Sequence, residues 1–257
     1  MIEGTPKNVT VSRKGSHWFI SIQTEMMIAE PVHPSTTMVG GDRGIKRFLT
    51  LSDGKVYEPL NAFRQMEKKL AQEQRKLARQ VKNSKNWYKQ KGRITKLHIR
   101  IADMRNDYLH KISTTISKNH AVVVLEDLKV KNMSASAKGT ADAPGKRVKQ
   151  KSVLNKSILD QGWGNFRLFL EYKQVHLGGM VLYVSAAYTS QQCSGCGHVH
   201  PDNRISQAEF VCLSCGLELN ADLNAAINIS RAGHAHLACQ ANGEAMSSAT
   251  GTSRKAA

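Results

Sequence analysis

The chain has 257 residues, of which 37 are Lys or Arg and 20 are Asp or Glu, so its formal net charge is +17. This excess indicates a polyanionic partner, while a hydrophobic fraction of 40% predicts a folded core and excludes wholesale disorder. No apolar run approaches the ~18 residues of a membrane span, and the first residues show no signal-peptide pattern. We therefore expect a cytoplasmic protein without a membrane partner.

The positive charge is concentrated in two segments. Residues 64–120 hold 16 basic and 4 acidic residues, and residues 129–156 hold 8 basic and 1 acidic, whereas the rest holds 13 basic and 15 acidic. A single run of charge is usually a solvated face. Because two segments carry the whole excess, we favour contact with nucleic acid, with an affinity that falls steeply as salt is added.

The amino-terminal elements are predicted to be strands. Residues 7–13 and 17–24 alternate apolar and polar side chains on either side of Lys14-Gly15, which is typical of a β-hairpin. Short alternating segments then predict a three-stranded meander, formed by residues 37–41, 48–51 and 56–57.

From residue 64 the apolar spacing becomes three and four residues, which predicts a helical hairpin with a turn at Asn83-Ser84. The aliphatic run at 121–125 predicts a central strand that ends in Glu126. Residues 134–151 are rich in Ser, Ala, Gly and Lys and predict a mobile basic loop. The remaining predicted elements are a helix at 158–176, a strand at 180–185, a helix at 221–231 and a disordered tail at 232–257.

The cysteines indicate a metal site. Four of the five form two Cys-x-x-Cys pairs, each followed by glycine: Cys193, Cys196, Cys212 and Cys215. This spacing is typical of a zinc ribbon, in which four thiolates close a tetrahedron around Zn²⁺, and a site with four protein ligands is structural. The neighbouring His198 and His200 are alternative ligands, and we expect Cys239 to be a free thiol.

If the zinc is structural, other residues must carry any chemistry, and acidic residues at the ends of predicted elements are candidates. Asp42 follows one strand, Glu126 ends another and Asp222 opens the last helix. If such carboxylates converge, they require hard cations such as Mg²⁺, which support phosphodiester hydrolysis. Taken singly, Asp42 is equally typical of a turn, Glu126 of a salt bridge and Asp222 of a helix cap.

Other residues are candidates for nucleic-acid contact. Three basic side chains near the acids are either phosphate contacts or surface charges: Arg43, Lys46 and Arg204. Trp87 and Tyr88 lie among the lysines of the helical hairpin and are candidates for base stacking. Three further aromatics have helical spacing and are expected in the core: Trp163, Phe166 and Phe169.

Four segments in this order resemble the TnpB/OrfB proteins of bacterial insertion sequences, which are relatives of the type V CRISPR effector nucleases. They are Gly40–Lys46, Val123–Leu128, Thr189–Gly197 and Asn220–Ile229. The resemblance covers residues 7–231 and implies an α/β fold of the RNase H-like (RuvC) type, with a mixed sheet, flanking helices, an inserted helical hairpin and a zinc ribbon. It implies Asp42, Glu126 and Asp222 as the catalytic, Mg²⁺-binding residues.

The same resemblance implies a transposon-encoded, Mg²⁺-dependent, RNA-guided DNA endonuclease whose partners are DNA and a guide RNA from its own locus. The implied domains are the end of a β-barrel (1–34), a RuvC-like domain (35–188) with an inserted hairpin (61–119), a zinc ribbon (189–218), a final helix (219–231) and a disordered tail (232–257).

Because the chain starts at what resembles the last hairpin of the barrel, we expect an amino-terminally truncated member of the family. The alternatives are a truncated, non-cleaving nucleic-acid-binding remnant or repressor, and a strand-transferring transposase of the same fold.

Overall fold

The computed structural model describes residues 2–140 and 142–249. The chain forms two compact units, each assembled from separate stretches of sequence. The helical unit comprises residues 1–32, 60–112 and 134–169, and the sheet unit comprises residues 33–59, 113–133 and 170–257. No helix among the described residues is long and apolar enough to cross a membrane.

The sheet unit is built on five strands in the order β5-β4-β3-β6-β7. These are β3 (Met38–Asp42), β4 (Leu49–Leu51), β5 (Val56–Tyr57), β6 (Val122–Glu126) and β7 (Met180–Val184). The strands β3, β6 and β7 run parallel, whereas β4 and β5 continue from β3 as an antiparallel meander. The predicted meander, the central strand and the strand at 180–185 are therefore confirmed, and the sheet is mixed.

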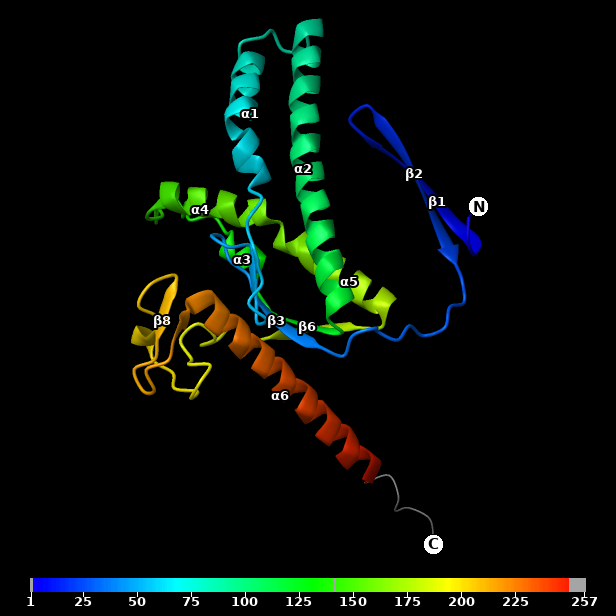
Figure 1. Ribbon diagram of the computed structural model, residues 1–257. Coiled ribbons are helices and arrows are strands. Elements are labelled where there is room, and N and C mark those ends of the chain that lie inside the picture. The colour runs from blue at the N-terminus through cyan, green and yellow to red at the C-terminus, as the bar shows by residue number, and fades with distance from the viewer. Residues whose placement is uncertain (1, 141, 250–257) are drawn as a thin grey trace. The chain divides into compact units, whose positions relative to one another are not determined.

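The last helix packs closely on this sheet. Residues 123–125 of β6 are fully buried, and helix α6 (Ala221–Ala249) contacts β3 (Figure 1). A Cβ on Gly40 would lie 2.3 Å from the carbonyl oxygen of Ala226 and 2.4 Å from the backbone nitrogen of Ser230. Glycine at this position of β3 therefore lets the helix backbone contact the strand directly.

Helix α6 is longer than predicted. The sequence predicted a helix at 221–231 and disorder from residue 232, but the helix continues to Ala249. Its continuation packs on the sheet, because a Cβ on Gly233 would lie 2.4 Å from Cγ2 of Val124. Residues 250–257 of the predicted tail lie outside the described residues.

The predicted helical hairpin is confirmed by α1 (Ala62–Ala78) and α2 (Lys85–Asn119), which run side by side in Figure 1. At the turn, Asn83 has a φ of 65°, and the hydroxyl of Ser84 accepts a hydrogen bond of 3.1 Å from the backbone N–H of Trp87. This is the capping geometry that begins a helix.

One predicted helix is two helices. Instead of a single helix at 158–176, the chain forms α4 (Val148–Gln161) and α5 (Trp163–Leu177), separated by Gly162 with a φ of 70°. A Cβ on Gly162 would lie 2.8 Å from Cδ of Arg105, so the break occurs where space is restricted.

Shortly before this break, Asp160 caps the first turn of helix α1. The carboxylate of Asp160, near the end of α4, accepts hydrogen bonds from the backbone N–H groups of Phe63 and Arg64 in the first turn of α1. It also forms an ion pair of 2.9 Å with Arg105. This buried acid therefore supplies the cap of α1 from a distant part of the sequence.

Helix α4 begins within the segment that was predicted to be a mobile loop, and the short helix α3 (Val130–Met133) precedes that segment. In α5, Trp163 and Phe166 are buried, as predicted for core residues. Phe169 is partly buried and stacks on His110, with ring centroids 3.9 Å apart.

The predicted amino-terminal hairpin is confirmed by β1 (Thr5–Lys14) and β2 (His17–Glu25), which pair in antiparallel register about Gly15. Apolar side chains on both strands are exposed, including Val9 and Trp18. The assignment of this hairpin to a β-barrel stays a prediction.

The cysteine segment lies in the sheet unit. It contains the short 3₁₀ helix η1 (Pro201–Asn203) and two strands, β8 (Glu209–Val211) and β9 (Glu218–Asn220). These strands pair antiparallel, and β9 leads directly into α6.

Candidate functional site

The four paired cysteines converge. Their sulfur atoms all lie within 4.8 Å of one another: Cys193, Cys196, Cys212 and Cys215. Backbone N–H groups of Gly195 and Cys215 point to the sulfur atoms of Cys193 and Cys212, at 3.3 and 3.5 Å. Four soft thiolate ligands at this spacing, with amides directed at sulfur, fit a zinc ion with no open coordination position.

The ionisation of Cys212 suits this role. Although burial acts to raise the pKa of this thiol, hydrogen bonds from the backbone amides of Cys215 and Ser214 and from the Cys196 side chain lower it to about 6. A thiol with this pKa is largely a thiolate at neutral pH, which is the form that binds metal. The neighbouring thiols raise the pKa of Cys215 to about 12, so this ligand would lose its proton when the metal binds.

The alternative ligands stand apart from this cluster. Within the part of the chain that the structure describes, the group of metal-ligating side chains consists of the four cysteines without His198 or His200. The two imidazole rings stack on each other with centroids 6.1 Å apart. Cys239 is an exposed free thiol on α6, as predicted.

The three candidate carboxylates come from three elements that meet at one end of the sheet. Asp42 is the last residue of β3 and Glu126 is the last residue of the neighbouring parallel strand β6. Asp222 lies in the first turn of α6, which packs on β3. Parallel strands bring their carboxyl ends to the same edge of a sheet, so the topology explains why residues far apart in sequence are neighbours.

The electrostatics of Asp42 show that the three acids interact. Burial is the largest cause that raises the pKa of Asp42 from 3.8 to about 7, and the charges of Glu126 and Asp222 raise it further. The guanidinium groups of Arg204 and Arg43 act in the opposite direction. A bound cation would further stabilise the anionic form of a buried carboxyl beside two other acids, and oxygen ligands suit Mg²⁺.

Glu126 is buried, with 7% of its surface exposed. Burial raises the pKa of its carboxyl, while a hydrogen bond from Thr189 and the charge of Arg43 lower it. The Thr189 hydroxyl donates to Oε1 of Glu126 at 2.6 Å, and the guanidinium of Arg43 donates to the Glu126 backbone oxygen. Arg43 thus contacts the backbone of Glu126 and acts on its carboxyl through charge, and a salt bridge of Glu126 stays a prediction.

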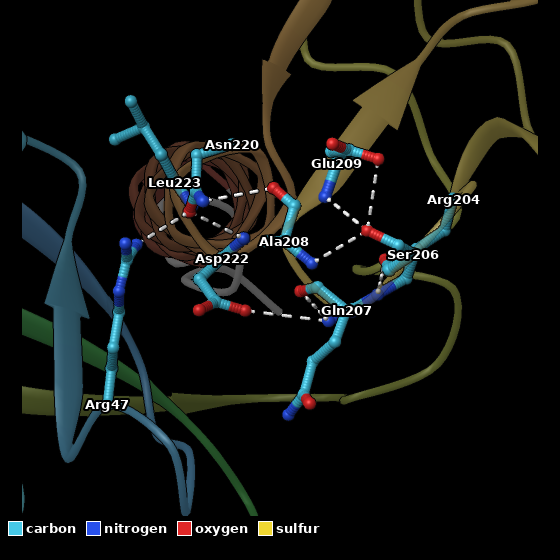
Figure 2. A network of polar contacts seen from close by, with 9 residues as sticks. All are labelled: Arg47, Arg204, Ser206, Gln207, Ala208, Glu209, Asn220, Asp222 and Leu223. Carbon is cyan, nitrogen blue, oxygen red and sulfur yellow. Dashed lines mark hydrogen bonds and ion pairs between the residues drawn. The ribbon is translucent and has the colours of Figure 1, made fainter.

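Asp222 is not the cap of α6, because Asn220 takes that place. The side-chain oxygen of Asn220 accepts hydrogen bonds from the backbone N–H groups of Asp222 and Leu223, at 3.2 and 3.3 Å (Figure 2). The Asp222 carboxylate is instead 3.4 Å from the guanidinium of Arg204, which follows η1 in the cysteine segment. Figure 2 also shows Arg47, which donates to the Asn220 side chain at 3.0 Å.

The predicted phosphate contacts differ in their surroundings. Arg43 is buried and Arg204 is partly buried, and each is engaged with the carboxylate cluster. Lys46 is exposed. Contact of these three side chains with phosphate stays a prediction.

Four polar residues near the acids were given no role from the sequence: Thr189, Asn220, Asn224 and Asn228. Asn224 and Asn228 are buried and lie four residues apart on α6, which places them on one face of the helix. That pattern is visible in the sequence, and buried amides require partners, so it could have indicated a segment bound to the helix.

Two family models match the chain. Residues 18–137 match OrfB_IS605, described as "Probable transposase", and residues 163–229 match the Cas12f1-like TNB domain. The first match includes Asp42 and Glu126, and the second includes the four paired cysteines and Asp222.

Curated relatives match most of the chain. It is 56% identical over 238 residues to "Putative RNA-guided DNA endonuclease InsQ" of Escherichia coli K12, a match that covers 93% of this chain and 59% of that protein. It is 35% identical over 236 residues to a "Putative RNA-guided DNA endonuclease" of Streptomyces pristinaespiralis, covering 91% and 54%. The chain therefore spans little more than half the length of these relatives.

A solved structure shares the fold. The cryo-EM structure of a Cas12f1-sgRNA-target DNA complex matches with a TM-score of 0.50 and 20% sequence identity, covering 86% of this chain and 55% of that chain. The fold is thus the α/β arrangement of a mixed sheet with helices that Cas12f1 also has.

The chain thus carries a match to a transposase model followed by a match to a Cas12f1-like domain. With these matches and a 56% identical relative, the chain belongs to the TnpB/OrfB family.

Proposed function

We propose that the chain is a Mg²⁺-dependent, RNA-guided DNA endonuclease with a RuvC-like, RNase H-type nuclease domain. One observation carries this proposal: Asp42, Glu126 and Asp222 lie close enough for the two other charges to help raise the pKa of Asp42 to about 7. Such a cluster is unfavourable without bound cations and is therefore typical of a cation site.

The residues that would hold Mg²⁺ are Asp42, Glu126 and Asp222. When bound, Mg²⁺ would supply an activated water and stabilise the leaving oxygen of a phosphodiester. The protein groups fix the acids: β3 and β6 hold Asp42 and Glu126 on neighbouring strands, and Arg204 restrains Asp222. Arg43, fixed by the Glu126 backbone, offsets part of the negative charge around Asp42.

We further propose that the four-cysteine cluster holds a structural Zn²⁺. All four ligands come from the protein, so the metal would fix the fold of the ribbon and take no part in hydrolysis. The boundaries of the nuclease domain (35–188), the ribbon (189–218) and the amino-terminal barrel hairpin (1–34) belong to the same proposal.

The nucleic-acid partners in this proposal are DNA and a guide RNA from the same locus. The basic segment at 64–120 forms most of α1 and α2 and carries 16 basic residues. Near the turn of this hairpin, Tyr88 is 56% exposed and Lys91 lies 5.1 Å from the centroid of the Trp87 ring. An exposed Tyr88 and a partly buried Trp87 among cations are suited to stacking on bases beside a phosphate backbone.

The test is cleavage of labelled, guide-matched DNA by the protein co-expressed with RNA from its own locus. Reactions are run either with Mg²⁺ or in Mg²⁺-free buffer. No strong chelator is used, because it would also remove zinc. Wild-type protein should cleave only with Mg²⁺ and the RNA, and Asp42→Asn should cleave at least about a thousandfold more slowly with RNA retained.

The alternatives give different results in the same assay. Retained RNA and DNA binding without any cleavage by wild-type protein would identify a non-cleaving binding protein. Joined DNA products in place of plain breaks would identify a strand transferase.

A further inference from the structure

A buried hydroxyl contacts the second carboxylate of the cluster. Thr189 lies in the segment between β7 and the first cysteine pair, and 8% of its surface is exposed. Its hydroxyl donates a hydrogen bond of 2.6 Å to Oε1 of Glu126. A threonine hydroxyl has one hydrogen to donate, and the short contact with a carboxylate is stronger than the alternative contact of 3.2 Å with the carbonyl oxygen of Ala186.

The backbone before Thr189 adopts a conformation that bulky residues rarely have. Tyr188 has a φ of 63°, and its carbonyl oxygen accepts hydrogen bonds of 2.9 Å from the N–H groups of both Gln191 and Gln192. This left-handed residue turns the chain at the point where the next side chain meets Glu126. Such conformations persist where surrounding contacts hold them.

Those surrounding contacts come from α6. The side-chain N–H₂ of Asn228 donates to the carbonyl oxygens of Thr189 and Gln192, at 3.0 and 2.7 Å. One turn earlier, Asn224 donates to Gln192 at 2.7 Å and accepts from the backbone N–H of Ser194 at 2.8 Å. Two amides on one helix face therefore bind the backbone from Thr189 to the first cysteine pair.

We propose that Thr189 is a positioning residue for divalent-cation binding, and that Asn228 holds Thr189 in place. The hydroxyl restrains the Glu126 side chain through its contact with Oε1, which would keep this carboxylate oriented for a divalent cation. Groups that orient a metal ligand typically change metal affinity or activity about 10- to 100-fold when removed. This inference rests on the proposed nuclease site, and it assigns to that site a residue outside the three acids.

The test compares Thr189→Val, which removes the hydroxyl and keeps the shape, with Thr189→Ser, which keeps the hydroxyl. The matched control is Thr50→Val, because Thr50 is also buried in the sheet unit and its hydroxyl has no hydrogen-bond partner among the described residues. Binding of Mn²⁺ to zinc-loaded protein is measured by electron paramagnetic resonance, and the Mg²⁺ concentration for half-maximal cleavage is measured separately.

We expect Thr189→Val to weaken Mn²⁺ binding and to raise the half-maximal Mg²⁺ concentration by about tenfold or more. The Mn²⁺ affinity of Thr189→Ser should stay within about threefold of the wild-type value. The Mn²⁺ affinity of Thr50→Val should equal that of wild type. Equal Mn²⁺ binding by wild-type protein and Thr189→Val would overturn the role of Thr189 and leave the nuclease proposal intact. Absence of Mn²⁺ binding by wild-type protein would overturn the nuclease site and this inference with it.

Zinc content and the thermal unfolding midpoint of each variant separate positioning from folding. If Thr189→Val loses zinc or its cooperative transition, Thr189→Ala replaces it in the same comparison. A variant that keeps its zinc and its unfolding midpoint but binds Mn²⁺ at least about tenfold more weakly supports the positioning role. Loss of Mn²⁺ affinity that follows only the loss of zinc in every Thr189 variant, including Thr189→Ser, contradicts it.

Discussion

The sheet unit contains two groups of side chains, the four paired cysteines and the three carboxylates of the proposed nuclease site, and they are assembled in opposite ways. The cysteine cluster comes from two tight turns within 23 consecutive residues, Cys193–Cys215, and its four sulfur atoms lie within 4.8 Å of one another. The carboxylate cluster comes from β3, β6 and α6, which are far apart in the sequence. The pairing of β3 with β6 and the packing of α6 on β3 bring the three acids to the same end of the sheet.

The difference in chemistry matches the difference in assembly. Hydrogen bonds from backbone amides and a neighbouring thiol lower the pKa of Cys212 to about 6, whereas the neighbouring thiols raise that of Cys215 to about 12. Four thiols that share their protons in this way are typical of a site for a soft cation. Burial raises the pKa of Asp42, and the repulsion of Glu126 and Asp222 raises it further. The carboxylate cluster therefore depends on the rigidity of the elements that carry it, while the cysteine cluster depends on local turns.

The largest expected effect is on the cysteine cluster. Cys212→Ser should lose its zinc and leave the segment 193–215 open to proteolysis, because structural zinc supplies the folding energy of such small domains. Zinc per chain is measured by mass spectrometry, and the control is Cys239→Ser, which changes an exposed thiol on α6. The control should bind about one zinc ion per chain. Equal zinc in both variants would contradict the assignment.

The next effect is a pH dependence that belongs to the carboxylate cluster. An unfolded Asp42 ionises near its ordinary pKa of 3.8, whereas the folded protein keeps the proton up to about pH 7. The folded state therefore binds more protons between these values, and stability falls as pH rises from about 4 to about 7 and then levels off. In Mg²⁺-free buffer, Asp42→Asn should be more stable than wild type at pH 8 by about 2–4 kcal/mol.

Urea unfolding at pH 5 and pH 8 measures this difference, with Asp202→Asn as the control because the Asp202 side chain is 81% exposed. Added Mg²⁺ should reduce the advantage of Asp42→Asn, since a cation stabilises the ionised wild-type acid. If the free energy of unfolding depends on pH identically in wild type and Asp42→Asn, the pKa of Asp42 is not raised and the three acids do not interact as proposed.

A third prediction concerns the packing of α6 on β3, which should affect the carboxylate cluster and leave the cysteine cluster unchanged. Gly40→Ala places a Cβ against the backbone of α6 and should destabilise the chain by about 1–3 kcal/mol. It should weaken Mn²⁺ binding, because α6 carries Asp222, while zinc is retained. The control is Gly164→Ala in α5, where a Cβ would meet no atom within 4 Å. Loss of zinc together with Mn²⁺ affinity in Gly40→Ala would show that the clusters do not depend on different parts of the fold.

The smallest effect concerns Arg204, which belongs to the cysteine segment but contacts Asp222. The charge of Arg204 lowers the pKa of Asp42, so Arg204→Gln should raise that pKa further above about 7. Carbon-13 NMR of the Asp42 carboxyl follows the titration, with Arg13→Gln in the helical unit as the control. A fall in the Asp42 pKa in Arg204→Gln would contradict the geometry.

Local features of the fold were predictable from the sequence. The spacing of the cysteines predicted their cluster, because two short turns suffice to build it, and alternation predicted the amino-terminal hairpin and the meander. The turn at Asn83-Ser84 was also predicted, since the chemistry that ends one helix and begins the next lies in adjacent residues.

Features that depend on distant contacts were predicted less well. The places of Asp42, Glu126 and Asp222 in the sequence made each of them a separate candidate. Only the family resemblance predicted that the three acids form one site. The break at Gly162 lies against Arg105, and the continuation of α6 past residue 231 packs Gly233 against Val124. Both neighbours lie elsewhere in the chain. Thr189 was missed because its role depends on Glu126, 63 residues away.

The most direct test of the central claim is Mn²⁺ binding to zinc-loaded protein, measured by electron paramagnetic resonance in four variants. They are Asp42→Asn, Glu126→Gln, Asp222→Asn and the exposed control Asp202→Asn. If the three acids form one divalent-cation site, each of the first three variants loses at least about tenfold in Mn²⁺ affinity and the control binds like wild type. Wild-type affinity in any one of the three acid variants would contradict the account.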